Sequence, residues 1–196
     1  MEIKKMKKIK ILALFGKSGC GKDTIQNKLL QLAPETFHKI VSYTTRPRRQ
    51  NEVEGSDYYF ISQKEFTDLM YEDKFIEALE FNGWFYGTLE TSLDLDKINV
   101  GIFTPSGIEC LYQSAAEYNL KILPMYVYAT DATRLIRSLT RELEPDIKEI
   151  FRRWQADETD FSSIDYNYEI VHNQAEPMAW IYIFTKITRS CKDFFD

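Results

Sequence analysis

The sequence predicts a three-layer α/β domain in which helices cover both faces of a parallel β-sheet. An apolar run at Ile9–Phe15 leads into a glycine-rich loop and then into a helix-like stretch at 24–32. Further along, strand-like apolar runs at 100–103 and 122–128 are separated by a helical stretch at 107–118. Strands that alternate with helices at this spacing need crossover connections, which are typical of parallel sheets. With 196 residues, 44% of them hydrophobic, the chain can bury one substantial core, so we expect a single domain.

The loop after the first strand has the composition of a phosphate-binding loop. Residues 16–24 are Gly-Lys-Ser-Gly-Cys-Gly-Lys-Asp-Thr. Glycines let successive backbone N–H groups turn toward one anion at a helix N-terminus, and Lys22 can reach the β- and γ-phosphates. A glycine-rich turn that binds nothing would not need strand, loop, lysine and helix in this order. We therefore expect a nucleoside triphosphate to be bound by Ser18, Gly19, Cys20, Gly21, Lys22, Asp23 and Thr24.

One position of this loop departs from the usual pattern. The residue after the lysine normally supplies a Ser or Thr hydroxyl to magnesium, but here it is Asp23, and Thr24 follows it. A carboxylate is still a hard oxygen ligand for this ion. Mg²⁺ therefore remains the expected cofactor, with Asp23 as its expected protein ligand.

Shorter elements follow the first helix. Residues 39–43 form a short β-rich run, and residues 57–61 alternate apolar and polar side chains as a strand does. Ser62 and Glu65 have capping-box spacing, which predicts a helix that continues to about residue 71.

A polar segment and a final strand–helix pair complete the pattern. Residues 133–161 look helical but carry Arg and Glu on most faces, so they cannot all be core, and we expect a mobile flap. Residues 168–171 resemble a strand, and the helix that follows has Pro177 in its first turn. Its apolar residues at helical spacing predict a face packed on the core: Ile181, Phe184, Ile187 and Cys191.

Charge and composition restrict the possible partners. The net charge is −5, which argues against a general nucleic-acid binder, although residues 1–10 contain five lysines that we interpret as a short solvated tail. The three cysteines are far apart and only two histidines occur, so neither a disulfide framework nor a zinc site is expected. The apolar runs are too short to cross a bilayer and no signal-like segment begins the chain. We expect a cytoplasmic protein that binds no membrane, either monomeric or homodimeric.

A second group of motifs lies between residues 42 and 88. Residues 42–49 are Ser-Tyr-Thr-Thr-Arg-Pro-Arg-Arg, and they are followed by Phe75-Ile76-Glu77 and by Gly-Trp-Phe-Tyr-Gly-Thr at 83–88. Together with the phosphate loop, these ordered blocks resemble the guanylate kinase family, and the resemblance extends to about Asn173. It implies a P-loop NTPase fold with its core at 8–41, 94–132 and 162–196, an inserted monophosphate-binding region at 42–93, and a helical lid at 133–161.

The resemblance implies transfer of the γ-phosphoryl group of ATP to GMP or dGMP. Guanidinium groups and hydroxyls hold a dianionic phosphate well, and Glu77 can accept two hydrogen bonds from the edge that guanine has and adenine lacks, while Thr88 can donate to O6. The implied GMP-binding residues are Ser42, Arg46, Arg49, Tyr58, Glu77, Tyr86 and Thr88.

The lid segment contributes the remaining implied residues. Arg137, Arg141 and Arg152 have a spacing similar to that of the lid arginines of the family, with Arg134 and Arg153 as alternatives. Cations on a closing segment can neutralise charge on the transferred phosphoryl group, so these three and Lys22 are the expected catalytic residues. A merely solvated charged helix is the competing interpretation. Asn173 matches an asparagine that lies near the adenine of ATP in the family.

The chain also departs from the family pattern. Family members usually end the third core strand with acidic residues, whereas residues 102–107 are Ile-Phe-Thr-Pro-Ser-Gly, with Thr104 as a neutral substitute. Because Asp23 is gained where these acids are lost, we hypothesise that one carboxylate has moved from the strand to the loop. Two alternatives stay open: a monophosphate kinase of different base preference, and a non-catalytic binding module of the same fold.

Overall fold

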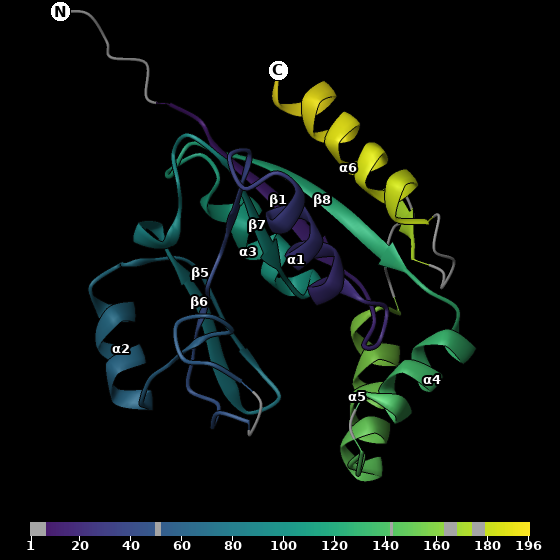
Figure 1. The fold of residues 1–196 in the computed structure, drawn as a ribbon. Helices are drawn as coiled ribbons and strands as arrows, with labels where there is room; N and C mark the ends of the chain where they lie inside the picture. Colours follow the sequence, from purple (N-terminus) through teal and green to yellow (C-terminus); the bar gives the residue numbers. More distant parts are fainter. Residues whose placement is uncertain (1–6, 50–51, 142, 163–167, 174–178) are drawn as a thin grey trace, which may run out of the picture.

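A five-stranded parallel sheet forms the centre of the computed structural model, which describes residues 7–49, 52–141, 143–162, 168–173 and 179–196. The strand order is β2-β7-β1-β8-β9, and every neighbouring pair is parallel. The strands are β1 (Ile9–Phe15), β2 (Phe37–Lys39), β7 (Ile98–Ile102), β8 (Leu120–Tyr128) and β9 (Glu169–His172). Helices α1 (Lys22–Leu32) and α6 (Ala179–Phe195) cover one face and α3 (Pro105–Ser114) covers the other (Figure 1). The predicted three-layer α/β fold is confirmed.

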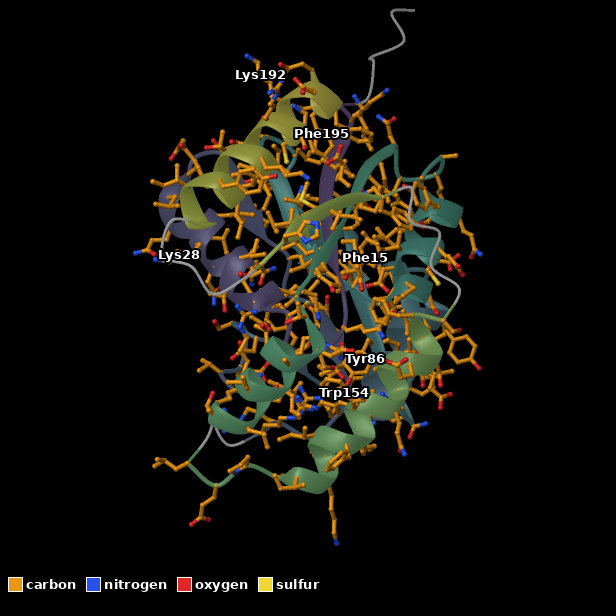
Figure 2. The ribbon with its side chains drawn as sticks, turned by 90° about the vertical axis from the view of Figure 1, so that its right-hand side faces the viewer. Phe15, Lys28, Tyr86, Trp154, Lys192 and Phe195 are labelled. Carbon is orange, nitrogen blue, oxygen red and sulfur yellow. The ribbon has the colours of Figure 1, made fainter. Side chains whose placement is uncertain are left out.

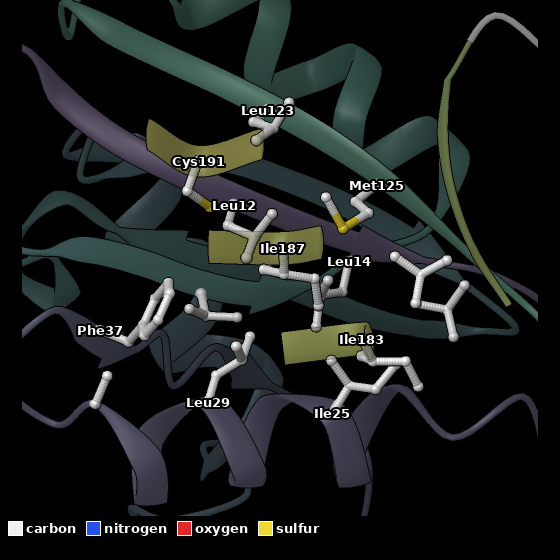
Figure 3. Close-up of a cluster of buried hydrophobic side chains, with 14 of the residues drawn as sticks. Leu12, Leu14, Ile25, Leu29, Phe37, Leu123, Met125, Ile183, Ile187 and Cys191 are labelled. Atoms are coloured by element: carbon white, nitrogen blue, oxygen red, sulfur yellow. The ribbon is translucent and has the colours of Figure 1, made fainter. Parts of the chain in front are cut away.

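Strand β1 separates two cores because successive side chains of a strand point to opposite faces. Leu12 and Leu14 are fully buried among residues of α1 and α6, such as Ile25 and Ile187 (Figure 3). Ile11 and the other odd-numbered residues of the strand pack on the opposite face with α3. A strand buried on both faces has to be apolar throughout, which explains the continuous hydrophobic run in the sequence.

A smaller second sheet lies beside the first and carries the residues of the expected monophosphate-binding region. Its order is β4-β3-β6-β5, and its strands are β3 (Tyr43–Thr44), β4 (Tyr59–Phe60), β5 (Phe75–Phe81) and β6 (Trp84–Leu89). Helix α2 (Gln63–Tyr71) precedes β5, and the 3₁₀ turn η1 (Glu90–Ser92) follows β6. The capping box expected for α2 is present, because Ser62 accepts from the Glu65 N–H while the Glu65 side chain accepts from the Ser62 N–H.

The polar segment forms two helices rather than one, α4 (Asp131–Thr140) and α5 (Ile147–Asp160). Each begins at a side-chain cap, Thr130 for α4 and Asp146 for α5. The pair lies below the carboxyl ends of the central strands (Figure 1).

Several local expectations differ from the structure: the helix expected at 107–118 is α3 (Pro105–Ser114), and the strand expected at 57–61 is the shorter β4. Helix α1 begins at Lys22, two residues earlier than expected, because Gly21 adopts the left-handed conformation that begins the helix. The run expected at 39–43 is divided between β2 and β3, which belong to different sheets. The β5–β6 hairpin was not predicted from the sequence. Pro177, expected in the first turn of the last helix, lies outside the described residues.

Among the described residues, none of the helices has the length and apolar character that crossing a membrane would require.

Candidate active site

A cavity of about 540 Å³ lies between the carboxyl edge of the central sheet, the second sheet and α5. Ligands of open parallel α/β sheets bind at this edge, where the connections leave the strands in opposite directions. Half of the expected site residues line the cavity: Ser18, Lys22, Ser42, Arg46, Arg49, Tyr58, Glu77, Tyr86 and Arg152. Residues more than a hundred positions apart in the sequence therefore share one site. In Figure 2, Tyr86 and Trp154 lie below Phe15 of β1, toward the α4–α5 end of the molecule.

The phosphate loop folds around its own lysine. Gly19 and Gly21 have φ values of 78° and 89°, which L side chains rarely adopt. The Lys22 ammonium donates to the carbonyl oxygens of Gly16 (2.6 Å) and Lys17 (3.3 Å). Asp23 and Thr24 are exposed in the first turn of α1. The loop is thus formed, and the lysine amine is hydrogen-bonded to carbonyl oxygens of the loop itself.

The Arg46 side chain is fixed by a carboxylate and two aromatic rings. Its guanidinium makes two parallel hydrogen bonds to the Glu52 carboxylate, at 3.0 and 2.8 Å, and lies over the rings of Tyr58 and Phe60. Arg49 lies 3.7 Å from the same carboxylate. Such a fork matches a phosphate as well as a carboxylate.

Two tyrosines, Tyr58 and Tyr86, also line the cavity. Burial, with smaller effects of Tyr86 and Asp23, raises the pKa of Tyr58 to about 12. The Tyr58 phenol therefore stays protonated at neutral pH and can donate a hydrogen bond to an anion.

Glu77 is the least satisfied polar group of the site. It is 5% exposed, and Oε1 accepts from the Thr88 hydroxyl (2.7 Å), which lies 3.0 Å from the Ser42 hydroxyl. Within the described part of the chain, Oε2 is buried and has no hydrogen-bond partner. Burial without a cation raises the pKa of Glu77 to about 7. A buried carboxylate oxygen at a cavity wall can accept a hydrogen bond from a ligand that enters the cavity.

The hairpin brings Glu77 to the cavity. A register shift between Phe75 and Glu77 marks a β-bulge, a device that re-aims side chains near functional sites. Alternation along the two strands then presents further cavity residues that the sequence analysis missed: Leu79, Phe81 and Trp84. Period-two spacing on either side of Asn82-Gly83 was the signal that could have found them.

The expected arginines of the lid segment occupy three different environments. Arg152 lines the cavity and donates to both oxygens of Glu149, at 2.6 and 2.9 Å. Arg137 instead donates to the carbonyl oxygens of Cys20 (3.3 Å) and Asn173 (3.2 Å). Arg141 is exposed at the end of α4 and is not among the lining residues of the cavity.

The two alternative arginines also differ. Arg153 lines the cavity and donates to Glu149 at 2.8 Å. Arg134 is 1% exposed, and its guanidinium bonds to protein groups rather than facing the cavity.

Asn173 contacts the phosphate loop from the end of β9. Its amide Nδ2 donates to the Cys20 carbonyl (2.8 Å), and its own backbone N–H donates to Tyr128. Asn173 is buried in this arrangement, against Gly21.

The end of β7 lacks a carboxylate, as the sequence indicates. Thr104 lines the cavity, but its hydroxyl caps α3 by accepting from the Gly107 N–H (3.1 Å). Among the described residues, no group of three or more His, Cys, Asp or Glu side chains could hold a metal ion. Mg²⁺ keeps several waters and commonly binds through one or two carboxylates plus phosphates, so the exposed Asp23 beside Lys22 fits an ion that arrives with a nucleotide.

This chain is similar to known proteins over most of its length. The family model for guanylate kinase matches residues 8–182. The guanylate kinase of Anaplasma phagocytophilum (strain HZ) is 32% identical over 174 residues, covering 86% of this chain and 81% of that protein. The guanylate kinase of Nostoc sp. (strain PCC 7120) is 47% identical over 79 residues, which are 40% of this chain and 39% of that protein.

A solved structure is similar over nearly the whole chain. The crystal structure of guanylate kinase from Anaplasma phagocytophilum matches with a TM-score of 0.66 and 25% identity, covering 94% of this chain and 86% of that one. Fold, ordered motifs and both kinds of relative lead to one assignment, and this chain belongs to the guanylate kinase family.

Proposed function

We propose that this protein transfers the γ-phosphoryl group of ATP to GMP or dGMP, giving ADP and GDP or dGDP. The observation that carries the proposal is the buried Oε2 of Glu77, which has no hydrogen-bond partner among the described residues and belongs to the same cavity as Lys22. A purine edge with two adjacent donors would satisfy both oxygens of that carboxylate, and guanine has such an edge. A purely binding module would need no lysine-bearing phosphate loop in this cavity.

The donor side is assigned to the phosphate loop. Its backbone N–H groups other than that of Ser18, which donates to Asp157, would bind the β- and γ-phosphates at the N-terminus of α1. Lys22 would exchange the carbonyl oxygens of Gly16 and Lys17 for phosphate oxygens. Mg²⁺ entering with ATP would be held by Asp23, phosphates and water, and would neutralise phosphate charge. Asn173 is assigned to the adenine side of the donor site.

The acceptor side is assigned to the second sheet. Arg46, Arg49 and the hydroxyls of Ser42, Tyr58 and Tyr86 would hold the GMP phosphate, and Glu77 would accept from N1–H and the exocyclic amine. Thr88 now donates its hydroxyl hydrogen to Glu77, so a bond from Thr88 to O6 of guanine would require that contact to open.

The chemical step needs alignment and charge neutralisation. An oxygen of the GMP phosphate forms a bond to the γ-phosphorus, while the bond from that phosphorus to the β–γ bridging oxygen breaks, and ADP leaves with the electron pair. Arg152, already beside the cavity, and the other lid arginines, Arg137 and Arg141, would balance the charge on the transferred group. Closure of both inserted segments would exclude water, which would otherwise compete as acceptor.

A coupled assay of ADP release tests the proposal. With ATP and Mg²⁺, we expect turnover with GMP or dGMP and far less with AMP, dTMP and CMP. Lys22→Ala should lower kcat by about 10² to 10³-fold, because a charge contact made to the transferring phosphates is lost. Calorimetry of that variant should still detect GMP binding. No turnover with any monophosphate would favour a binding module, and preference for another base would favour a different monophosphate kinase.

The role of Asp23 is tested separately. If the carboxylate of this loop replaces the one missing at Thr104, Asp23→Ala and Asp23→Ser should both raise the Mg²⁺ concentration needed for half-maximal turnover. Normal magnesium dependence in both variants would contradict the replacement.

The setting of the enzyme is also part of the proposal. We propose a cytoplasmic monomer or homodimer whose partners are ATP and GMP or dGMP. The free thiols of Cys20, Cys110 and Cys191 support a reducing compartment.

A further inference from the structure

Arg134 is a fully buried charge in the lid segment. It is 1% exposed on α4, and its guanidinium lies 4.2 Å from the ring centroid of Trp154 on α5. Each guanidinium nitrogen has a partner: Nε donates to the Ser18 carbonyl (2.8 Å), one terminal nitrogen to Asp131 (2.8 Å) and the other to Asp157 (2.5 Å). With these hydrogen bonds made, Arg134 is not available to a phosphate.

Asp157 connects this arginine to the phosphate loop. It is 6% exposed on α5 and lines the cavity. Its Oδ2 accepts from the Ser18 backbone N–H (2.8 Å) and its Oδ1 lies 3.2 Å from the Ser18 hydroxyl. We call this set, formed by Arg134, Asp157 and Ser18, the Ser18 anchor.

The anchor commits one residue of the phosphate loop to protein partners. At Ser18 the N–H, the carbonyl and the hydroxyl all bond to side chains of α4 and α5, whereas loops of this kind offer their N–H groups to a bound anion. The neighbouring Gly19 packs closely against α4, because an added Cβ would lie 2.7 Å from the carbonyl oxygen of Arg134 on that helix. The loop between β1 and α1 is thus fixed on its outer side by the lid helices.

We propose that Asp157, held by Arg134, is a positioning residue for the ATP phosphates: it fixes Ser18 so that the remaining loop amides and Lys22 converge on the donor. This inference rests on the proposed function and adds to it residues that contact no substrate. The charge of Asp157 is balanced within the anchor, so it need not repel the phosphates.

Two variants separate positioning from stability. Asp157→Asn keeps the shape but leaves the buried Arg134 short of a charged partner. The double variant Arg134→Leu with Asp157→Ala removes both charges together, and such apolar replacement of a buried ion pair is often neutral or stabilising. Asp131→Asn is the matched control. It removes the charge of only the exposed partner of Arg134, because the Asp131 side chain is 73% exposed.

The expected result is selective for the donor. The KM for ATP should rise about tenfold in the double variant and in Asp157→Asn, because charge-assisted hydrogen bonds that fix the loop are lost. The KM for GMP should stay unchanged in both variants. In the control Asp131→Asn, both KM values should stay unchanged. The double variant should keep the Tm of the unmodified protein within a few degrees. An unchanged KM for ATP in the folded double variant overturns the proposal, and so does a lowered one, which would make Asp157 a competitor of ATP. Equal increases in the KM for ATP and the KM for GMP would also overturn it, because Arg134 and Asp157 would then have only a general structural role.

Amide hydrogen exchange of nucleotide-free protein tests the anchor without activity. We expect slow exchange of the Ser18 N–H in the unmodified protein and in Asp131→Asn, and at least tenfold faster exchange in the double variant Arg134→Leu with Asp157→Ala, which has no side-chain acceptor at position 157. Equal exchange in all three contradicts the anchor. If the Ser18 N–H is protected but the unmodified protein has no kinase activity, the proposed function fails and the anchor stands. If the protein is an active kinase but the Ser18 N–H exchanges fast, the anchor fails and the proposed function stands.

Discussion

At the scale of single residues, the buried carboxyl group of Glu77 has an energetic cost. Burial raises its pKa from an ordinary 4.5 to about 7, so ionising it is harder in the folded protein than in the unfolded chain. The contribution of this group to folding is therefore greatest below pH 4.5, falls as the pH rises toward 7, and stays low above it. The shift corresponds to about 3 kcal/mol at most.

We expect Glu77→Gln to stabilise the ligand-free protein at pH 8 by about 2 to 3 kcal/mol, with little change at pH 4.5, because glutamine carries no buried charge and its carbonyl can still accept from Thr88. Urea unfolding at both pH values measures this difference. Glu80→Gln on the exposed side of the same strand is the control. Equal stability changes at the two pH values would show that Glu77 is not the group responsible.

The same substitution should weaken base recognition. An amide group in place of the carboxylate presents a donor to a guanine donor, so GMP recognition should fall by roughly 2 to 4 kcal/mol while ATP binding barely changes. Because Thr104 supplies no carboxylate, the preference for GMP over AMP should also narrow. Competition assays with both nucleotides give the ratio. An unchanged ratio would remove Glu77 from base recognition.

Arg46 allows a test in which charge is kept and geometry is lost. Arg46→Lys preserves the cation but not the planar fork now paired with Glu52, so the KM for GMP should rise strongly, by about tenfold or more. Arg48→Lys, an exposed neighbour in the same turn, is the control. Steady-state kinetics at varied GMP concentration should show a raised KM for GMP in Arg46→Lys but not in Arg48→Lys. The same KM for GMP in Arg46→Lys and in the unmodified protein would mean that the GMP phosphate does not bind at Arg46.

At the scale of elements, the β5–β6 hairpin decides the shape of the acceptor side. Asn82 and Gly83 at its turn have φ values of 54° and 77°, as in the two-residue turns whose twist matches that of the strands. One face of the hairpin then presents Glu77 and Tyr86 to the cavity.

Gly83→Ala isolates the backbone requirement of this turn. An added Cβ at Gly83 would meet no atom within 4 Å, so its cost comes from the positive φ alone, about 1 kcal/mol in the free energy of unfolding. Thermal or urea unfolding checks the value. A neutral or stabilising result would mean that the turn adopts another conformation.

At the scale of the whole molecule, the site exists because the parallel strands end at one edge. Helix α1 leads from β1 toward β2 on one side, and β8 lies on the other side of β1, so the phosphate loop leaves the sheet where the connections diverge. The second sheet and α5 then supply the other two walls of the cavity. No single element forms a usable site alone.

The sequence by itself determined the features that depend on near neighbours in the chain. The apolar run of β1, the glycine loop, Lys22 and the capping box at Ser62 are each specified within about ten residues, so composition and spacing predict them. The order of the motifs also predicted the family and the parallel sheet. These local rules involve backbone geometry that only a few residue types satisfy.

Only the tertiary structure decided which charges belong to the site. Arg134, Arg137 and Arg152 lie on one polar segment, yet one is buried with Asp157, one contacts the Cys20 carbonyl and one lines the cavity. The orphan oxygen of Glu77 and the Ser18 anchor were equally invisible in the sequence. Burial and pairing of a charge depend on groups tens of residues away, whose approach is fixed by packing of the complete fold rather than by local spacing.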